Sequence, residues 1–454
     1  MVIYPSIQLL FQTVYYTTMG WQQRISSINI QIAIIGTLFV GAIVAVVIPG
    51  YLSHKPTQNS IRTSSQKLDT NIALLSTQIQ ENPKNPELYI DLSHAYLQKV
   101  RETADSAYYT KIQDLMTHAE TLDPTNPNIP ATNASVELGR HHFKEAKQYA
   151  EQALARDSHN NIYYGLLGDA EIELGQYSKA VDAFQKMSDL RPDYSSYIRI
   201  AYIRELYGDI PRAKESLQLA ISSGSSFKEN IAFAYVELGK LTMRTNLPEA
   251  SVYFMDALRS VPDYPPALEG LGKVALFNGD SAHAEEYFLK AYNTLSIVQY
   301  ATDVGDLYLQ QGKKDASIQY ITLAKTAFAQ SEKSGVDTDL EQSLFLSDHD
   351  IDLSEALIRA KRAYTVRPSI YAADYLGWAY YKNGQFVQAS QYEKEALRLG
   401  DTDSLILFHQ GMIALKNGNT SKAKTYLAKS LQLNPYFSIL QSRVASDTLK
   451  NMSL

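Results

Sequence analysis

The chain lacks cysteine altogether, although it is 454 residues long. This absence excludes disulfide bonds, zinc sites built on thiolates and a catalytic cysteine. A basic footprint is also missing, because the formal net charge is −6 and no block of lysine and arginine stands out. Proteins that bind nucleic acids need such a footprint to displace counterions from phosphates. We therefore expect no nucleic-acid partner.

Recognisable catalytic motifs are absent as well. The sequence contains no H-E-x-x-H zinc motif, no P-loop and no dinucleotide-binding glycine fingerprint. Apart from the adjacent His141 and His142, its histidines are scattered, so a catalytic triad could be assembled only by arbitrary choice. We predict that the protein is not an enzyme and that it uses no cofactor.

One acidic turn, "DHDID" at residues 348–352, has the residue types of a site for a hard cation. It departs from the calcium-loop pattern, because no glycine follows Asp352 and the twelfth position is Arg359 instead of glutamate. The alternative is a polar turn in which Asp352 or Ser354 caps the start of a helix. We favour the cap and predict no metal site.

A stretch near the start is both long and uncharged. It runs from Ile28 to Leu52 and reads "INIQIAIIGTLFVGAIVAVVIPGYL". This is long enough for a membrane span, because a helix needs about 20 apolar residues to cross a bilayer. A buried helix and a cleaved signal peptide are the alternatives, but no A-x-A cleavage site follows. The stretch predicts a transmembrane signal anchor at 28–52, with an N-terminal tail at 1–27 and a polar linker at 53–67. The true start, at Met1 or Met19, stays open.

The side of the membrane is ambiguous from charge. Arg24 precedes the stretch, while Lys55, Arg62 and Lys67 follow it, which favours a cytoplasmic C-terminal part. The short tail and the missing cysteines favour the opposite side, and long domains translocate largely regardless of such counts. Our prediction is a single-pass protein of the cell membrane with an extracytoplasmic C-terminal part.

A spacing of 34 residues recurs near the C-terminus. It separates three matching pairs, Gly377 and Gly411, Gly384 and Gly418, and Ala389 and Ala423. A fixed period of this length is typical of tetratricopeptide repeats, in which each unit is a pair of antiparallel helices. The first glycine lets the second helix approach, the second glycine ends the first helix, and the alanine lies where the helices cross.

The same frame continues upstream. It places matching residues at Gly168, Gly175, Ala180, Gly272, Gly279, Ala284, Gly305 and Gly312. We predict an all-α fold, a superhelix of about ten hairpins between Pro86 and Pro435. A lone helix around Leu68–Glu81 precedes them and a capping helix around Ser438–Leu449 follows, so the array and its cap span 68–454.

Several longer pieces carry a more specific likeness. They include "LGDAEIELGQYSKAVDAF", "RPDYSSYIRIAYIRELYGDIPRAKESL" and "RPSIYAADYLGWAYYKNGQ". On these pieces the chain resembles a large group of bacterial tetratricopeptide repeat proteins, from about Leu68 to Leu440. The resemblance implies an all-helical binding scaffold and no reaction.

Such arrays present a row of first-helix side chains along a concave face. We therefore predict a membrane-anchored scaffold that binds a protein or peptide partner in this groove, within a cell-envelope assembly. The alternatives are a structural spacer in a secretion or envelope complex, a regulatory subunit of an enzyme and, less favoured, an enzyme built in the groove. The oligomeric state stays open.

The predicted groove residues lie in the last two units. They are Tyr371, Trp378, Tyr381, Lys382, Phe408 and Met412. We expect four of them to form one apolar patch with Asp374 at its edge, namely Trp378, Tyr381, Phe408 and Met412. Aromatic residues and methionine are enriched at interface cores, which favours an anchor pocket. The alternative is that the patch packs against the capping helix.

Overall fold

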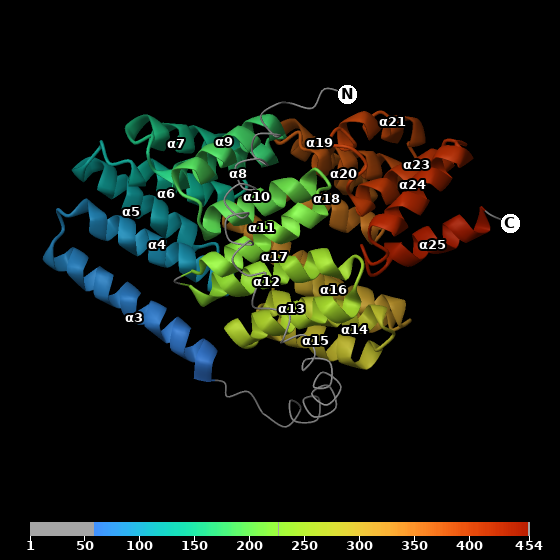
Figure 1. Ribbon diagram of the computed structural model, residues 1–454, viewed down its shortest axis with the longest axis horizontal. Helices are drawn as coiled ribbons and strands as arrows, with labels where there is room; N and C mark the ends of the chain where they lie inside the picture. The colour runs from blue at the N-terminus through green and yellow to red at the C-terminus, as the bar shows by residue number, and fades with distance from the viewer. Residues whose placement is uncertain (1–58, 226, 453–454) are drawn as a thin grey trace, which may run out of the picture. The chain divides into compact units, whose positions relative to one another are not determined.

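The computed structural model describes residues 59–225 and 227–452, and all regular structure in these ranges is helical (Figure 1). The helices are α3 (Asn59–Glu81), α4 (Pro86–Thr103), α5 (Tyr108–Leu122), α6 (Asn128–Gly139), α7 (Phe143–Arg156), α8 (Asn161–Glu173), α9 (Tyr177–Leu190), α10 (Tyr194–Leu206), α11 (Ile210–Ser223), α12 (Lys228–Met243), α13 (Leu247–Ser260), α14 (Pro265–Phe277), α15 (Ser281–Thr294), α16 (Val298–Gln310), α17 (Lys314–Lys333), α18 (Asp339–Asp348), α19 (Leu353–Val366), α20 (Ile370–Lys382), α21 (Phe386–Ser390), α22 (Glu393–Ala396), α23 (Ser404–Lys416), α24 (Thr420–Leu433) and α25 (Gln441–Asn451).

From α4 to α24 the described helices form ten consecutive hairpins that pack in series, with the seventh and eighth joined by the cluster of Phe328 and Phe345. The helix α3 precedes them, and its Leu75 packs on Leu92 and Ala95 of α4. The helix α25 follows them. The prediction of an all-helical solenoid of tetratricopeptide type is therefore confirmed for this part of the chain.

Small residues allow the two helices of each hairpin to approach closely. A side chain at Gly168 would collide with the ring of Phe184, and one at Gly272 would collide with the ring of Phe288. The corresponding contacts are made by Gly305 against Ile321, Gly377 against the carbonyl of Ala389, and Gly411 against Leu427. The alanines at the helix crossings are fully buried, at Ala180, Ala284, Ala389 and Ala423.

The turn glycines end the first helices. Gly384 and Gly418 have φ angles of 73° and 80°, in the left-handed region that a side chain disfavours. Gly175, Gly279 and Gly312 have similar positive φ angles.

One hairpin departs from the regular pattern. The second helix of the ninth hairpin is divided into α21 and α22. At the break the amides of Gln391 and Tyr392 donate to the carbonyls three residues earlier, at Gln388 and Ala389. These tighter bonds replace the i→i−4 pattern of an α-helix, so the path of the helix shifts there.

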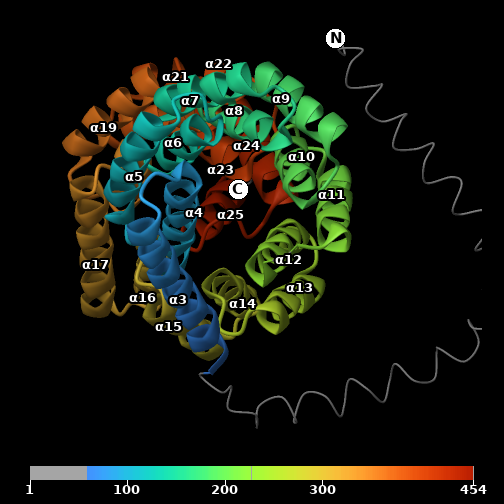
Figure 2. The same cartoon turned by 90° about the vertical axis from the view of Figure 1, so that its left-hand side faces the viewer.

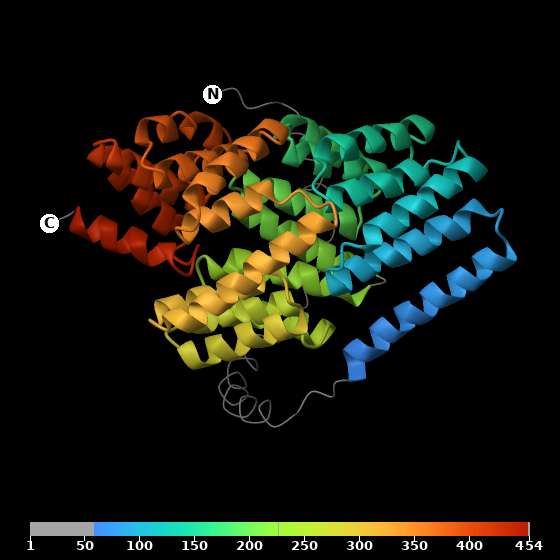
Figure 3. The ribbon, with the colours of Figure 1, turned by 180° about the vertical axis from the view of Figure 1, so that it is seen from behind.

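The superhelix turns back onto itself after about six hairpins. Figures 2 and 3 show the first hairpins beside those from α18 onward. Here Arg367 pairs with Glu173, and Thr402 donates to the carbonyl of Leu206. A shared apolar cluster joins the two turns, with Phe184 and Ile203 on one side and Ile406 on the other. We call this line of contact the seam.

The predicted membrane location needs correction. No helix in the described residues is both long and apolar enough to cross a bilayer, which contradicts a single-pass membrane protein. The segment Ile28–Leu52, on which that prediction rested, lies outside the described residues. The prediction of a membrane location rested on the hydropathy of this one stretch, and no described helix supports that location.

Candidate functional site

A cavity of about 1000 Å³ lies on the inner side of the superhelix. The first helices of seven successive hairpins line it, namely α10, α12, α14, α16, α18, α20 and α23. The segment Asn434–Leu440, between α24 and α25, lines it as well. We call this cavity the lumen. First helices face inward in such arrays, so the lumen is the concave groove that the repeat pattern predicts.

A charged cluster lies in the middle of the lumen, on α14 and α16. Lys273 forms an ion pair with Glu269 and lies 3.8 Å from an oxygen of Asp303. The Asp303 carboxyl is buried, and burial raises its pKa to about 8 despite the nearby Lys273 ammonium. Its Oδ2 atom has no hydrogen-bond partner among the described residues. A buried polar atom of this kind is costly unless it is satisfied, so a polar group of a ligand would be favourable here.

A second polar pair follows on α16 and α18. His349 Nε2 lies 2.8 Å from a carboxylate oxygen of Asp306, and His349 Nδ1 lies 2.7 Å from the carbonyl of Phe345. Burial alone would lower the pKa of His349, but the bond to Asp306 outweighs burial and raises it. The bond to Asp306 therefore stabilises the imidazolium form of His349 relative to the neutral form.

The acidic turn at 348–352 makes separate contacts. Asp348 accepts hydrogen bonds from Trp378 and Gln441, and Asp350 pairs with Lys382 at 2.6 Å. The side chain of Asp352 accepts from the amide of Glu355 and caps α19. These carboxylates thus point to different partners, and the cap is the alternative that we favoured from the sequence.

Four of the predicted groove residues come together in one cluster. Trp378 stacks on Tyr381 at 4.6 Å between ring centroids, and Phe408 and Met412 pack beside them. However, Trp378 and Phe408 are only 4% and 2% exposed, because Ala445, Leu449 and Met452 at the C-terminal end cover the cluster. Their role as partner anchors stays a prediction, and it concerns a surface that α25 covers.

Asp374 adjoins this cluster through His409, whose ring stacks on Trp378. It is fully buried and accepts bonds from His409 Nδ1 at 2.6 Å and from Gln410 at 3.1 Å. Burial raises the pKa of Asp374, while His409 opposes the shift. Asp374 therefore belongs to the packing between α20 and α23.

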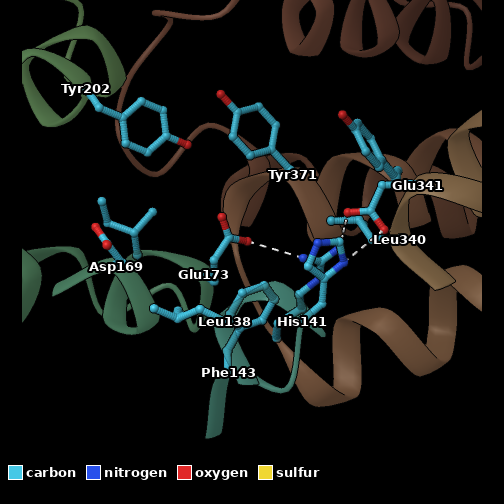
Figure 4. Close-up of a pocket in the computed structure, with 12 residues that line it drawn as sticks. Leu138, His141, Phe143, Asp169, Glu173, Tyr202, Leu340, Glu341 and Tyr371 are labelled. Carbon is cyan, nitrogen blue, oxygen red and sulfur yellow. Dashed lines mark hydrogen bonds and ion pairs between the residues drawn. The ribbon is translucent and has the colours of Figure 1, made fainter. Parts of the chain in front are cut away.

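Tyr371, the remaining predicted aromatic residue, lies in a second hollow of about 520 Å³ at the seam. Figure 4 shows it facing Tyr202, with Glu173 and Glu341 nearby. Both carboxylates bind the guanidinium of Arg367, at 3.3 Å and 2.5 Å. Arg367 thus pairs with carboxylates from two turns of the superhelix and joins them. We regard the lumen as the better candidate site.

Sequence reasoning missed the charged cluster and the C-terminal segment. Glu269, Lys273 and Asp303 resemble ordinary surface residues in a helical pattern, so no local signal singles them out. The segment did carry a signal. The run "NPYFSIL" is apolar and aromatic, yet it follows the last repeat and has no helical period.

Comparison with known proteins gives two family matches. Residues 132–195 and 405–437 each match a model described as tetratricopeptide repeat. A curated relative from Fusarium oxysporum f. sp. lycopersici, the tetratricopeptide repeat and J domain-containing co-chaperone DNJ1, is 29% identical over 119 residues. That match covers 26% of this chain and only 22% of the relative.

Solved structures give weaker likenesses. The crystal structure of yeast Tom70 is 15% identical with a TM-score of 0.39, covering 86% of this chain and 93% of that one. A human IFIT1 dimer with m7Gppp-AAAA is 17% identical with a TM-score of 0.45, covering 73% and 77%. At such scores the likenesses carry no argument about this chain. The two family matches, together with the ten hairpins, support a tetratricopeptide repeat protein.

Proposed function

We propose that the chain is a scaffold that binds a protein or peptide partner inside its lumen. One observation carries this proposal, namely that the first helices of seven successive hairpins line one continuous cavity. The cavity offers apolar contacts, such as Phe277 and Leu344, beside charged groups, such as Lys240 and Asp303. Mixed surfaces of this kind suit a polypeptide, whose side chains and backbone supply both kinds of contact. Repeat arrays of this type are generally scaffolds without catalytic activity.

We propose no role in a cell-envelope assembly, because that prediction depended on the membrane location. The partner therefore has to be sought without assuming a compartment.

A pair of threonines on neighbouring helices tests the proposal. Thr302 on α16 lines the lumen, and Thr322 on α17 is exposed. Each donates its hydroxyl to the carbonyl four residues earlier, so the two positions are matched. Thr302→Trp places a bulky ring in the lumen, whereas Thr322→Trp adds the same bulk outside it.

The measurement is affinity capture with the tagged full chain and quantification of the co-purifying polypeptides. We expect Thr302→Trp to reduce the yield of the partner at least tenfold and Thr322→Trp to leave it unchanged. Equal yields from both variants would show that the partner binds elsewhere. Circular dichroism spectra of both variants establish that the array remains folded.

A further inference from the structure

The segment Asn434–Leu440 leaves the path of the repeats and lies in the lumen. The helix α24 ends at Leu433, and the backbone of Asn434 is extended. The chain then reaches α14–α16, three to four hairpins upstream, before α25 begins at Gln441. This segment, which we call the crossing segment, therefore contacts residues more than 100 positions away.

Two side chains anchor the crossing segment on the inner helices. Ile439 is 5% exposed and packs with Leu276 and Val304, in the apolar layer between α14 and α16. Tyr436 packs on the neighbouring cluster, with its ring centroid 4.9 Å from that of Phe277. The anchors are three positions apart and lie side by side on the lumen wall.

The opposite side of the crossing segment contacts the C-terminal hairpins. The ring of Phe437 lies 5.5 Å from that of Phe408 on α23. Next to it, Gln441 donates to Asp348 at 2.6 Å. The crossing segment and α25 thus sit between the lumen wall and the cluster of Trp378 and Phe408.

The crossing segment is held by side chains. In the described residues no backbone-to-backbone hydrogen bond joins Tyr436–Leu440 to α14 or α16. Its own amides use local acceptors, since Tyr436 donates to Asn434 and Ser438 donates to the hydroxyl of Ser442. A contact built on a few apolar anchors, without a shared backbone ladder, can be exchanged for another peptide with the same anchors.

We propose that the crossing segment is an internal occupant of the binding site in the lumen, and that the partner is a polypeptide presenting an aromatic and an aliphatic side chain three positions apart. This inference rests on the proposed function and specifies the partner for it. The partner would displace Tyr436 and Ile439 from α14–α16. Release of the crossing segment would also free α25 and expose Trp378 and Phe408, which are the residues predicted from the sequence as partner anchors.

The test uses the full chain and a fluorescent peptide with the sequence of residues 433–441, LNPYFSILQ. Fluorescence anisotropy measures its binding to the wild type, to the double variant Tyr436→Ser/Ile439→Ser, and to Val444→Ser, which alters an exposed residue of α25. We expect the double variant to bind the peptide at least tenfold more tightly than the wild type, because its own segment no longer competes. Val444→Ser should behave as the wild type, and a peptide with serine at both anchors should not bind.

A second variant distinguishes release of the crossing segment from loss of folding. Gln441→Ala removes the bond to Asp348 and leaves both apolar anchors in place, and it should increase peptide binding several-fold. If both variants stay folded by circular dichroism and neither binds the peptide better than the wild type, the crossing segment is a fixed structural element and the inference is wrong. This outcome is distinct from failure of the proposed function, which Thr302→Trp tests separately. If Thr302→Trp reduces capture of the partner but the peptide does not bind, the lumen remains the binding site. Only the role of the crossing segment as its internal occupant is then rejected.

Discussion

The hydroxyl of Tyr177 accepts a hydrogen bond of 2.9 Å from the amide of Ile370, 193 residues later in the chain. Ile370 is the first residue of α20, so its amide has no partner within its own helix. A residue of one superhelical turn thus satisfies the start of a helix in the next turn. Contacts such as this one close the array around its lumen.

Gly175 should be less tolerant of substitution than the other turn glycines. An alanine there has an unfavourable φ angle, and its Cβ would also collide with the carbonyl of Pro368 across the seam. At Gly312 the φ angle is similar, but nothing lies within 4 Å of the added Cβ. We expect Gly312→Ala to cost about 1–2 kcal/mol from the backbone alone and Gly175→Ala to cost more. Thermal unfolding of both variants measures the difference, and equal melting temperatures would mean that the seam is open in solution.

Tyr177→Phe should weaken the seam without removing a ring. The variant leaves the buried amide of Ile370 without its acceptor, which typically costs about 1–3 kcal/mol. Hydrogen exchange at the start of α20 should accelerate. Tyr164→Phe is the control, because the Tyr164 hydroxyl bonds locally to the carbonyl of Ser158 at 3.3 Å. Unchanged exchange at Ile370 in the Tyr177 variant would argue against the contact.

The stability of the array should fall as the pH rises above 5. The folded chain holds a proton on Asp303 up to a pKa of about 8, whereas the ordinary pKa of aspartate is 3.8. Between these values the unfolded chain binds fewer protons, so each pH unit lowers the unfolding free energy by up to about 1.4 kcal/mol. His349 acts in the same direction above its ordinary pKa of 6.5, because its folded pKa is raised.

Asp303→Asn should flatten this pH dependence. The groups around Asp303 are Lys273 and Glu269 on α14 and Gln299 and Asp306 on α16, and the variant leaves all of them in place. Melting temperatures at pH 5, 6, 7 and 8 measure the slope, with Asp182→Asn on the exposed face of α9 as the control. A slope as steep in Asp303→Asn as in the wild type would contradict the assignment.

Trp378→Ala should lower stability, and not only partner binding. Trp378 is buried, stacks on Tyr381 and His409, and donates to Asp348 at 2.7 Å. Truncation of such a side chain typically costs about 3–5 kcal/mol. Val387→Ala, at a side chain that is 66% exposed in the same hairpin, is the control. A melting temperature that matches the control would show that Trp378 is accessible and would restore its role as a free anchor.

The hairpins could be predicted from the sequence because their signals are local. Gly384 and Ala389 belong to one helix pair, and a fixed spacing is enough to identify such pairs. The contact of Tyr177 with Ile370 could not be predicted in this way. It depends on small rotations between hairpins that add up over about six units, and no local pattern encodes their sum.

The candidate site was predicted only in part for a related reason. An inward-facing aromatic residue such as Trp378 has the same pattern whether it meets a partner or the chain's own α25. The crossing segment has no period at all, so its return to α14–α16 depends on the apolar surface that the superhelix leaves open. The charged cluster of Lys273 and Asp303 has no local sequence pattern, because it forms only where the fold brings first helices of different hairpins together.

Photo-crosslinking from inside the lumen tests the central claim most directly. The full chain carries p-benzoyl-L-phenylalanine in place of Phe277, which lines the lumen, in one preparation and in place of the exposed Phe227 in another, and each is irradiated with the captured partner. The account predicts a covalent product with the partner polypeptide from position 277 and none from position 227. A product from position 227 alone, with position 277 silent, would contradict the claim that the partner binds in the lumen.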